Sequence, residues 1–333
     1  MEPMPVFQLL RPTRVAEAVA ARAGAKGARF LAGGTDLLAN MRRGLVGCDT
    51  LIDLTAIAEL RRIDVDGGGL HIGALVTLEA LASHPDVQAN YAALVQAALS
   101  IAGPTHRASG TVGGNLCLDT RCRYYNQSEP WRHANEYCMK IAGDACRVAP
   151  KADRCYAAYS GDLAPALMVL DAVAEIAGPG RSRRVPLSEL YTDDGMAHLV
   201  LAPDELLVAV HVPSQSGTRS GYEKLRIRGA VDFALAGVAM ALRVQGDEIH
   251  ELRIATTGTD SRPMMIADLQ GVWRMVPEDD ARLAKLLRHQ IGPMETTLTS
   301  AAYRRRVVPV LARRLMRQLA GATVHPLDQQ QHS

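Results

Sequence analysis

The sequence has little of several things, and each shortage narrows the possible functions. Aromatic residues make up only 4% of the 333 residues, and 37 Lys and Arg against 35 Asp and Glu leave a formal charge of +2. Without a field of one sign, neither nucleic acid nor an anionic membrane is expected as a partner. There is no basic N-terminal region before an apolar run, and no run of eighteen apolar residues. This predicts a cytoplasmic protein with no membrane span.

Hydrophobic residues are abundant, at 48%, and can supply the cores of two or three packed units. Periodicity predicts mixed elements and therefore an α+β fold. The strands are expected at 29–32, 50–54, 70–74 and 172–177, and the helices at 14–25, 77–83 and 91–102, while residues 162–170 are expected to form a short helix or the edge of a strand. The stretch with Arg181, Arg183 and Arg184 is interpreted as a loop.

A polar, glycine-rich run at 214–221 has the composition of a linker, and we place a domain boundary there. The first domain is predicted over residues 1–215, with two subdomains that divide near residue 56. A smaller α+β C-terminal domain covers 216–333, with strands at 233–245 and 251–256 and a helical tail over 279–320.

Two glycine-rich runs are candidates for binding a phosphate. In Leu31-Ala-Gly-Gly-Thr-Asp-Leu37, small residues between a strand and a helix let backbone N–H groups approach an anion. Taken alone, this run is explained more simply as an ordinary turn with an N-cap, and its spacing is not G-x-G-x-x-G. The second run, Gly110-Thr-Val-Gly-Gly-Asn115, adds a hydroxyl and an amide, with a tight turn or bulge as the alternative.

The two runs belong to a longer ordered pattern that resembles a known family. A-G-G-x-x-L, I-D-L, I-G-A-h-h-T, R-x-x-G-T-h-G-G-N and D-L-x-P follow one another at 32–37, 52–54, 72–77, 107–115 and 162–165, and Y-E-K-L-R begins at Tyr222. This order resembles the FAD-binding medium subunit of the molybdenum hydroxylases. The resemblance implies FAD between two α+β subdomains, bound by Leu31, Ala32, Gly33, Gly34, Thr35, Asp36, Leu37, Thr111, Gly114, Asn115, Asp162 and Lys224.

Five of the six cysteines fall between Cys117 and Cys155, in a segment that looks like an insert of about 117–160. In a cytosolic chain they are expected to bind metal or to be buried as thiols, since disulfides are rare there. The last four, Cys122, Cys138, Cys146 and Cys155, form C-x15-C-x7-C-x8-C, which suffices for a [4Fe–4S] cluster. These four contain no short C-x2-4-C pair, which disfavours zinc without excluding it.

The remaining cysteines receive other roles. Cys117 lies two residues after Asn115 and is assigned to the flavin scaffold, while Cys48 is interpreted as structural. A plant-type [2Fe–2S] site beginning at Cys117 would need a thiol at Tyr125, where there is none. Five of the nine tyrosines lie in or beside this segment, where they can exclude water from a cluster or simply form its core.

A cluster-bearing insert in this scaffold is similar to the medium subunits of the 4-hydroxybenzoyl-CoA reductases, a subgroup of the family. That implies a molybdopterin large subunit, a small subunit with two [2Fe–2S] clusters, and reduced ferredoxin as the electron donor in anaerobic aromatic degradation. No residue of this chain would then be catalytic. Two alternatives stay open: an ordinary molybdenum hydroxylase subunit that passes electrons to NAD or a quinone, and a zinc-stabilised assembly module without redox function.

Overall fold

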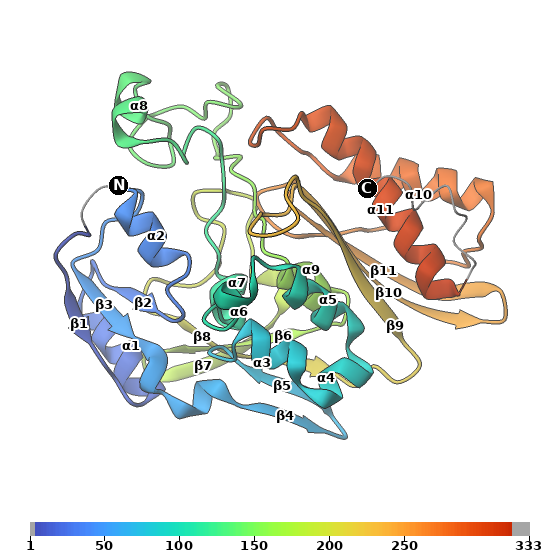
Figure 1. Ribbon diagram of the computed structural model, residues 1–333, viewed down its shortest axis with the longest axis horizontal. Coiled ribbons are helices and arrows are strands. Elements are labelled where there is room, and N and C mark those ends of the chain that lie inside the picture. Colours follow the sequence, from blue (N-terminus) through green and yellow to red (C-terminus); the bar gives the residue numbers. More distant parts are fainter. Residues whose placement is uncertain (1–3, 322–333) are drawn as a thin grey trace.

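A computed structural model describes residues 4–321, whose strands form three sheets (Figure 1). The first is a parallel sheet in the order β1-β3-β2, made of Gln8–Leu10, Thr50–Asp53 and Arg29–Leu31. Parallel neighbours need a crossover, and helices α1 (Val15–Gly24) and α2 (Leu37–Arg42) supply it. Ala18 and Val19 of α1 are buried in one core with Ile52 of β3.

The second sheet has five antiparallel strands in the order β4-β5-β8-β6-β7. Their bounds are Ile63–Asp66, Gly69–Gly73, Leu206–Pro213, Val173–Gly178 and Arg181–Pro186. Short 3-10 turns occur at Leu54–Ala56, Ala58–Arg61 and Leu187–Glu189. Seven helices lie between β5 and β6; one belongs to residues 117–160 and is described below, and the other six are α3 (Leu78–Ser83), α4 (Pro85–Asn90), α5 (Ala92–Ser100), α6 (Pro104–Arg107), α7 (Val112–Leu116) and α9 (Leu163–Met168). Buried residues of β5, α5 and α9 share one core, which fixes the second subdomain.

The C-terminal part is an antiparallel sheet backed by two long helices, in orange and red in Figure 1. The strands are β9 (Arg219–Leu225), β10 (Ala236–Gln245), β11 (Glu248–Thr257) and β12 (Met264–Met265), and the helices are α10 (Pro277–Gln290) and α11 (Ala301–Ala320). Ser300 caps α11 by accepting a hydrogen bond of 3.1 Å from the Tyr303 N–H, and Gly321 ends it with a φ of 82°. Trp273, Val308 and Met316 are buried between helices and sheet.

Residues 117–160, called the cysteine segment below, contain one short helix, α8 (Glu129–Ala134), and are otherwise loops. In Figure 1 this segment rises beside α2, and the contacts agree. The Tyr125 hydroxyl donates to the Leu45 carbonyl at 3.2 Å, and Arg132 donates to the Gly44 carbonyl at 3.1 Å. A single bridge, Arg121 to Ala158, pairs the two ends of the segment.

The α+β class is confirmed, and so are the predicted strands and helices of the first 180 residues. The loop prediction for Arg181, Arg183 and Arg184 was wrong, because Gly178-Pro-Gly180 turns the chain into a hairpin and these residues form β7. The predicted linker at 214–221 is shorter in the structure, because strand β9 begins at Arg219, which pairs with Leu242 of β10. The helical tail is also interrupted, between Gln290 and Ala301.

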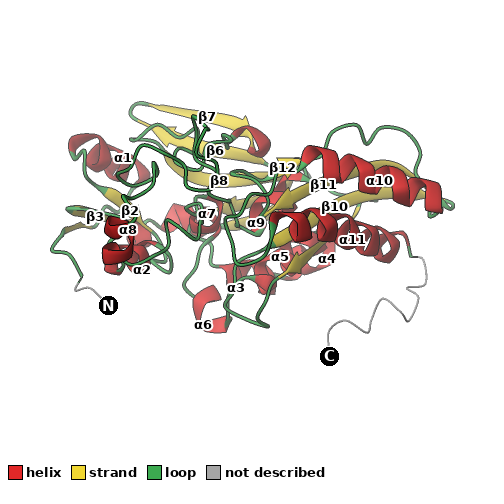
Figure 2. Ribbon diagram, turned by 90° about the horizontal axis from the view of Figure 1, so that it is seen from above, coloured by secondary structure: helices red, strands yellow, loops and turns green. Residues whose placement is uncertain are grey.

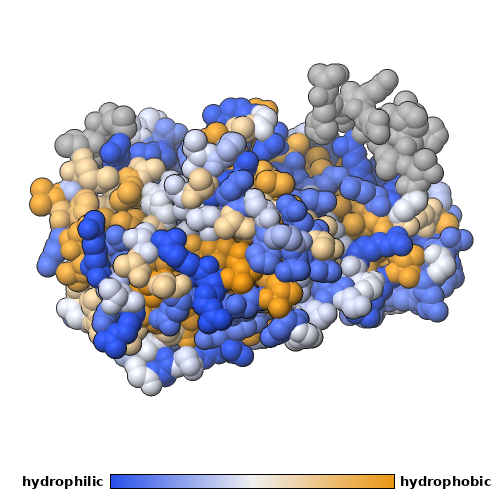
Figure 3. Space-filling view, turned by 60° about the horizontal axis from the view of Figure 1, so that its bottom comes forward, coloured by the Kyte–Doolittle hydropathy of each residue, from blue (hydrophilic) through white to orange (hydrophobic). Residues whose placement is uncertain are grey.

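The surface carries scattered apolar side chains. Figure 3 shows the molecule turned so that the bottom of Figure 1 faces the viewer. On this face, hydrophilic residues surround patches of apolar residues. Large exposed apolar residues come from distant parts of the chain, such as Val6 at 96% and Leu298 at 88% exposure. None of the helices within residues 4–321 is long and apolar enough to cross a membrane. Seen from above, the three sheet-centred parts follow one another along the long axis (Figure 2).

Candidate cofactor site

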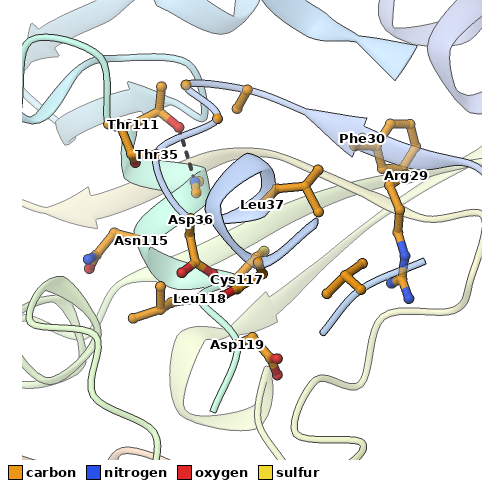
Figure 4. Close-up of a pocket in the computed structure, with 18 of the residues that line it drawn as sticks. Arg29, Phe30, Thr35, Asp36, Leu37, Thr111, Asn115, Cys117, Leu118 and Asp119 are labelled. Carbon is orange, nitrogen blue, oxygen red and sulfur yellow. Dashed lines mark hydrogen bonds between the residues drawn. The ribbon is translucent and has the colours of Figure 1, made fainter. Parts of the chain in front are cut away.

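The two glycine-rich runs, far apart in the sequence, lie against each other in space. A Cβ atom on Gly33 would overlap the Ser109 carbonyl oxygen, so only glycine allows the two backbones to come this close. A Cβ on Gly110 would lie 3.6 Å from the Thr35 hydroxyl oxygen. Figure 4 shows Thr35 and Thr111 side by side where the runs meet. The first subdomain therefore contacts the second through backbone.

The first run presents unpaired backbone donors. The N–H groups of Gly33, Gly34, Thr35 and Asp36 donate to no other group within residues 4–321. The carbonyls of Gly34 and Asp36, in contrast, accept bonds of 3.2 and 3.0 Å from Leu38 and Asn40 of α2. A φ of +70° at Gly34 makes this turn possible. Four consecutive free N–H groups at the start of a helix suit a phosphate or diphosphate.

The second run is built differently, because most of its N–H groups already have hydrogen-bond partners. Val112 and Gly113 donate to the carbonyls of Val76 and Ala74, both at 2.9 Å, and Gly114 donates to the Thr111 hydroxyl at 3.1 Å. Thr111 is thus the N-cap of α7. The Asn115 Oδ1 accepts from the Leu163 N–H at 3.0 Å and ties α7 to α9. This run offers side chains to a ligand, while the first run offers backbone.

Both runs line one cavity of about 840 Å³. Ten of the twelve predicted cofactor residues line it, namely Ala32, Gly33, Gly34, Thr35, Asp36, Leu37, Thr111, Gly114, Asn115 and Asp162. The other two lie elsewhere. Leu31 is the last residue of β2, and Lys224 stands behind Asp162, with an N–O distance of 3.1 Å. Lys224 therefore positions a residue of the cavity wall.

Sequence reasoning missed several residues of this cavity. Arg121 forms an ion pair with Asp36, and its guanidinium lies 4.7 Å from the centre of the Phe233 ring. The Arg121 side chain is 9% exposed and that of Asp36 is 28% exposed, and the guanidinium offsets the Asp36 charge beside the free N–H groups. Arg121 is not part of a local motif. Phe233 lies in the run Y-E-K-L-R-x-R-x-x-x-D-F-A that begins at Tyr222, but that run indicated only the start of the C-terminal domain and no place at the cavity.

His198 is a second residue that no motif marks. It is 8% exposed and lines the cavity, and its Nε2 has no hydrogen-bond partner within the described residues. Burial lowers the pKa of His198 to about 4, and the nearby Lys140 lowers it further, against the opposing effect of Asp119. The ring is therefore neutral at pH 7, with a nitrogen free to meet a bound molecule.

The four cysteines nominated as ligands converge on a second, much smaller cavity. Cys122, Cys138, Cys146 and Cys155 are all buried, and all four line it together with Tyr125 and Lys140. Cys117 lines the large cavity instead. Cys48 lies in neither cavity, and its thiol donates to the Thr50 carbonyl at 2.8 Å. Cysteines far apart in the cysteine segment thus lie around one small cavity.

The donor set around the small cavity consists of four thiols. Within residues 4–321, no group of three or more His, Cys, Asp or Glu side chains is placed to hold a metal ion as it stands. Four thiols around a common space fit a cubane, whose separate irons each take one thiolate. The space between them is about 10 Å³, so the sulfur atoms must move outward to admit it.

Two of these thiols, those of Cys122 and Cys155, are poor anions without a bound metal. Burial raises the pKa of Cys155 to about 12, although the Ala157 N–H and Lys140 oppose the shift. Burial also raises the pKa of Cys122. A coordinated iron would stabilise the thiolates that burial disfavours, so these side chains would gain their charge together with the metal.

A cavity between two α+β subdomains, with free N–H groups on a glycine-rich turn, defines a protein that binds a cofactor containing a diphosphate. Comparison with known families agrees. Residues 5–215 match the FAD binding domain in molybdopterin dehydrogenase, and residues 220–319 match the CO dehydrogenase flavoprotein C-terminal domain. The chain belongs to this family of FAD-binding subunits of molybdenum hydroxylases.

Individual relatives of this chain are subunits of enzymes from the same family. The chain is 36% identical over 279 residues to the aldehyde oxidoreductase FAD-binding subunit PaoB of Escherichia coli, covering 80% of this chain and 86% of that one. It is 32% identical over 257 residues to the carbon monoxide dehydrogenase medium chain of Hydrogenophaga pseudoflava, covering 76% and 75%. A crystal structure of the Cu,Mo-CO dehydrogenase superposes with a TM-score of 0.79 at 26% identity, covering 96% and 99%. The chain is thus the FAD-containing electron-transfer subunit of a molybdenum hydroxylase complex.

Proposed function

We propose that this chain relays electrons between FAD in the large cavity and a [4Fe–4S] cluster bound by Cys122, Cys138, Cys146 and Cys155. The observation that carries the proposal is the convergence of four buried thiols on one small cavity beside the cofactor cavity. The other buried cysteine-segment residues supply a water-poor surrounding, which tunes a cluster's potential.

The residues of the chain hold and orient the flavin cofactor. The N–H groups of Gly33, Gly34, Thr35 and Asp36 bind the diphosphate, and Arg121 balances the Asp36 carboxylate nearby. Thr111, Gly114 and Asn115 contact the cofactor from the second run. FAD supplies the ability to take one or two electrons, and the protein sets its orientation and potential. No side chain acts as a general acid, base or nucleophile.

The chain works as the medium subunit of a heterotrimeric unit. A large subunit carries the molybdopterin, and a small subunit carries two [2Fe–2S] clusters. Domain limits of 1–215 and 216–333, with the cysteine segment as an insert in the first, complete the proposal. The matched family models end and begin at residues 215 and 220, which supports this division.

Two reactions of the whole complex are candidates. The first is the reductive removal of the hydroxyl of 4-hydroxybenzoyl-CoA in the cytoplasm, with electrons that arrive from reduced ferredoxin. It is supported by the four-cysteine insert, which an ordinary hydroxylase of this family does not need. In this direction, electrons pass from the [4Fe–4S] site to FAD and then toward molybdenum.

The second candidate is aldehyde oxidation, in which electrons leave molybdenum and pass outward through FAD. It is favoured by the 36% identity to an aldehyde oxidoreductase FAD-binding subunit. The acceptor would then be NAD, a quinone or a protein that meets the cluster. A zinc-stabilised module without redox function has less support, because the chain belongs to a family of FAD-binding subunits and the four cysteines contain no short C-x2-4-C pair.

One preparation tests the relay, and one assay separates the two reactions. The complex is purified without oxygen, and FAD, iron, acid-labile sulfide and molybdenum are measured. About four irons and one FAD on this chain support the relay. Yellow protein whose medium subunit lacks iron contradicts the cluster. The same preparation is then assayed with 4-hydroxybenzoyl-CoA plus reduced ferredoxin, and with aldehydes plus an artificial acceptor.

A further inference from the structure

The two cavities share a wall that consists of two side chains. Tyr125 and Lys140 line the large cofactor cavity and also the small cavity of the four cysteines. They are the residues common to both linings within the described chain. Lys140 follows Cys138 by two positions and Tyr125 follows Cys122 by three, so each comes from a stretch that also supplies a thiol.

Lys140 is held firmly in this wall. Its side chain is 5% exposed, and its ammonium lies 2.7 Å from the Asp119 carboxylate. It also donates to the Gly195 carbonyl at 2.8 Å and to Thr120. A lysine with so many partners in so dry a place is a fixed positive charge rather than a solvated one.

Tyr125 completes the wall. Its ring lies 4.7 Å from the Lys140 nitrogen, close enough for a cation–π contact, and its hydroxyl lies 3.3 Å from the Asp119 carboxylate. Asp119 itself lines the large cavity. A positive charge, a negative charge and an aromatic ring therefore stand in one connected group between the two sites.

We propose that Lys140 and Tyr125 couple the two redox centres, with Lys140 setting their potentials and Tyr125 providing the packed path between them. The inference rests on the proposed function, since it presumes FAD in one cavity and the cluster in the other. Lys140 and Tyr125 are positioning residues. One centre loses an electron as the other gains it, so no further reactant is required and neither side chain changes covalently.

The sign of the effect follows from charge. Reduction adds an electron to a centre, and a nearby ammonium favours the reduced form, whereas a nearby carboxylate disfavours it. Lys140→Met should therefore lower the midpoint potentials of both centres, and Asp119→Asn should raise them. A charge so deeply placed should change the reduction equilibrium about tenfold, which is about 59 mV for one electron. A group that only holds the fold would give no opposite signs.

The test is a redox titration of the holo complex, followed by EPR for the cluster and absorbance for the flavin. The variants are Lys140→Met, Asp119→Asn, the double variant, and Lys151→Met as control, since Lys151 is exposed in the same segment and lines neither cavity. Opposite shifts for the single variants, with near wild-type potentials for the double variant and the control, support the proposal. The double variant also keeps the wall neutral if the single Lys140 variant folds poorly.

Two outcomes overturn this proposal alone, and a third overturns the proposed function on which it rests. If the variants retain FAD and iron but keep wild-type potentials, Lys140 does not set them. If Tyr125→Leu retains both centres and reduces the flavin as fast as wild type in stopped-flow mixing with a reductant of the cluster, Tyr125 is not the path. Iron missing from the wild-type chain defeats the proposed function itself, and the inference with it.

Discussion

The ammonium of Lys224, on β9, forms an ion pair of 3.1 Å with the carboxylate of Asp162, and each side chain is only 4% exposed. The Tyr222 hydroxyl donates to the same carboxylate at 2.6 Å, and Lys224 also donates to the Ser100 carbonyl at 3.2 Å. Asp162 lines the cofactor cavity, whereas Lys224 belongs to the C-terminal sheet. One buried pair thus attaches the C-terminal part to the wall of the cofactor site.

Loss of this lysine should destabilise the protein and weaken the site. In Lys224→Met, the Asp162 charge stays buried with one partner fewer, and the free energy of unfolding should fall by about 3 kcal/mol in a urea titration. The double variant with Asp162→Asn removes the stranded charge and should recover much of that stability. Equal losses in the single and double variants would show that the pair is not coupled.

Gly33 should be the most sensitive position of the first glycine-rich run. Gly33→Ala places a methyl group on the Ser109 carbonyl oxygen, so the two runs must separate and the free N–H groups lose their arrangement. The variant should fold with its circular dichroism spectrum intact and contain at least tenfold less FAD after purification. Gly24→Ala is the matched control, because a Cβ there meets nothing within 4 Å. Normal flavin content in Gly33→Ala would contradict the cradle.

His198 predicts a pH dependence of stability in the flavin-free protein. Its folded-state pKa of about 4 lies below the ordinary value of 6.5, so the unfolded state takes up a proton first as the pH falls. The folded state should therefore lose stability from about pH 6.5 down to about pH 4, by roughly 3 kcal/mol in total. His198→Phe lacks this titrating group, so its free energy of unfolding should rise relative to that of wild type as the pH falls from about 6.5 to about 4. A constant difference between the two proteins across this pH range would contradict the buried, neutral ring.

Much of the fold could be predicted from local patterns. Apolar alternation identified β3 and β5, and Gly-Pro breaks ended α5, because those signals come from neighbours in the chain. The strand β7 was not predicted because its arginines are typical of a solvated loop. They are compatible with a strand because the Arg183 guanidinium lies 2.7 Å from the carboxylate of the buried Glu205, which belongs to a distant segment.

The residues of the site also fall into those that local patterns identify and those that depend on contacts between distant segments. Gly33, Gly34 and Thr111 act through local backbone geometry, and a short motif is enough to find them. Arg121 and His198 act through contacts with segments that are distant in sequence, and no spacing rule reports them. The cysteines lie between these cases, because their number suggested a metal while their meeting at one cavity required the fold.

The claim that one chain holds both FAD and a [4Fe–4S] cluster is tested most directly by the EPR spectrum and iron content of Cys138→Ser in the anaerobically purified complex, with Cys48→Ser as the matched control. The Cys138 variant should lose the reduced-cluster signal and about four irons per chain while it keeps FAD, and the control should match wild type. An unchanged cluster signal and iron content in Cys138→Ser would contradict the account.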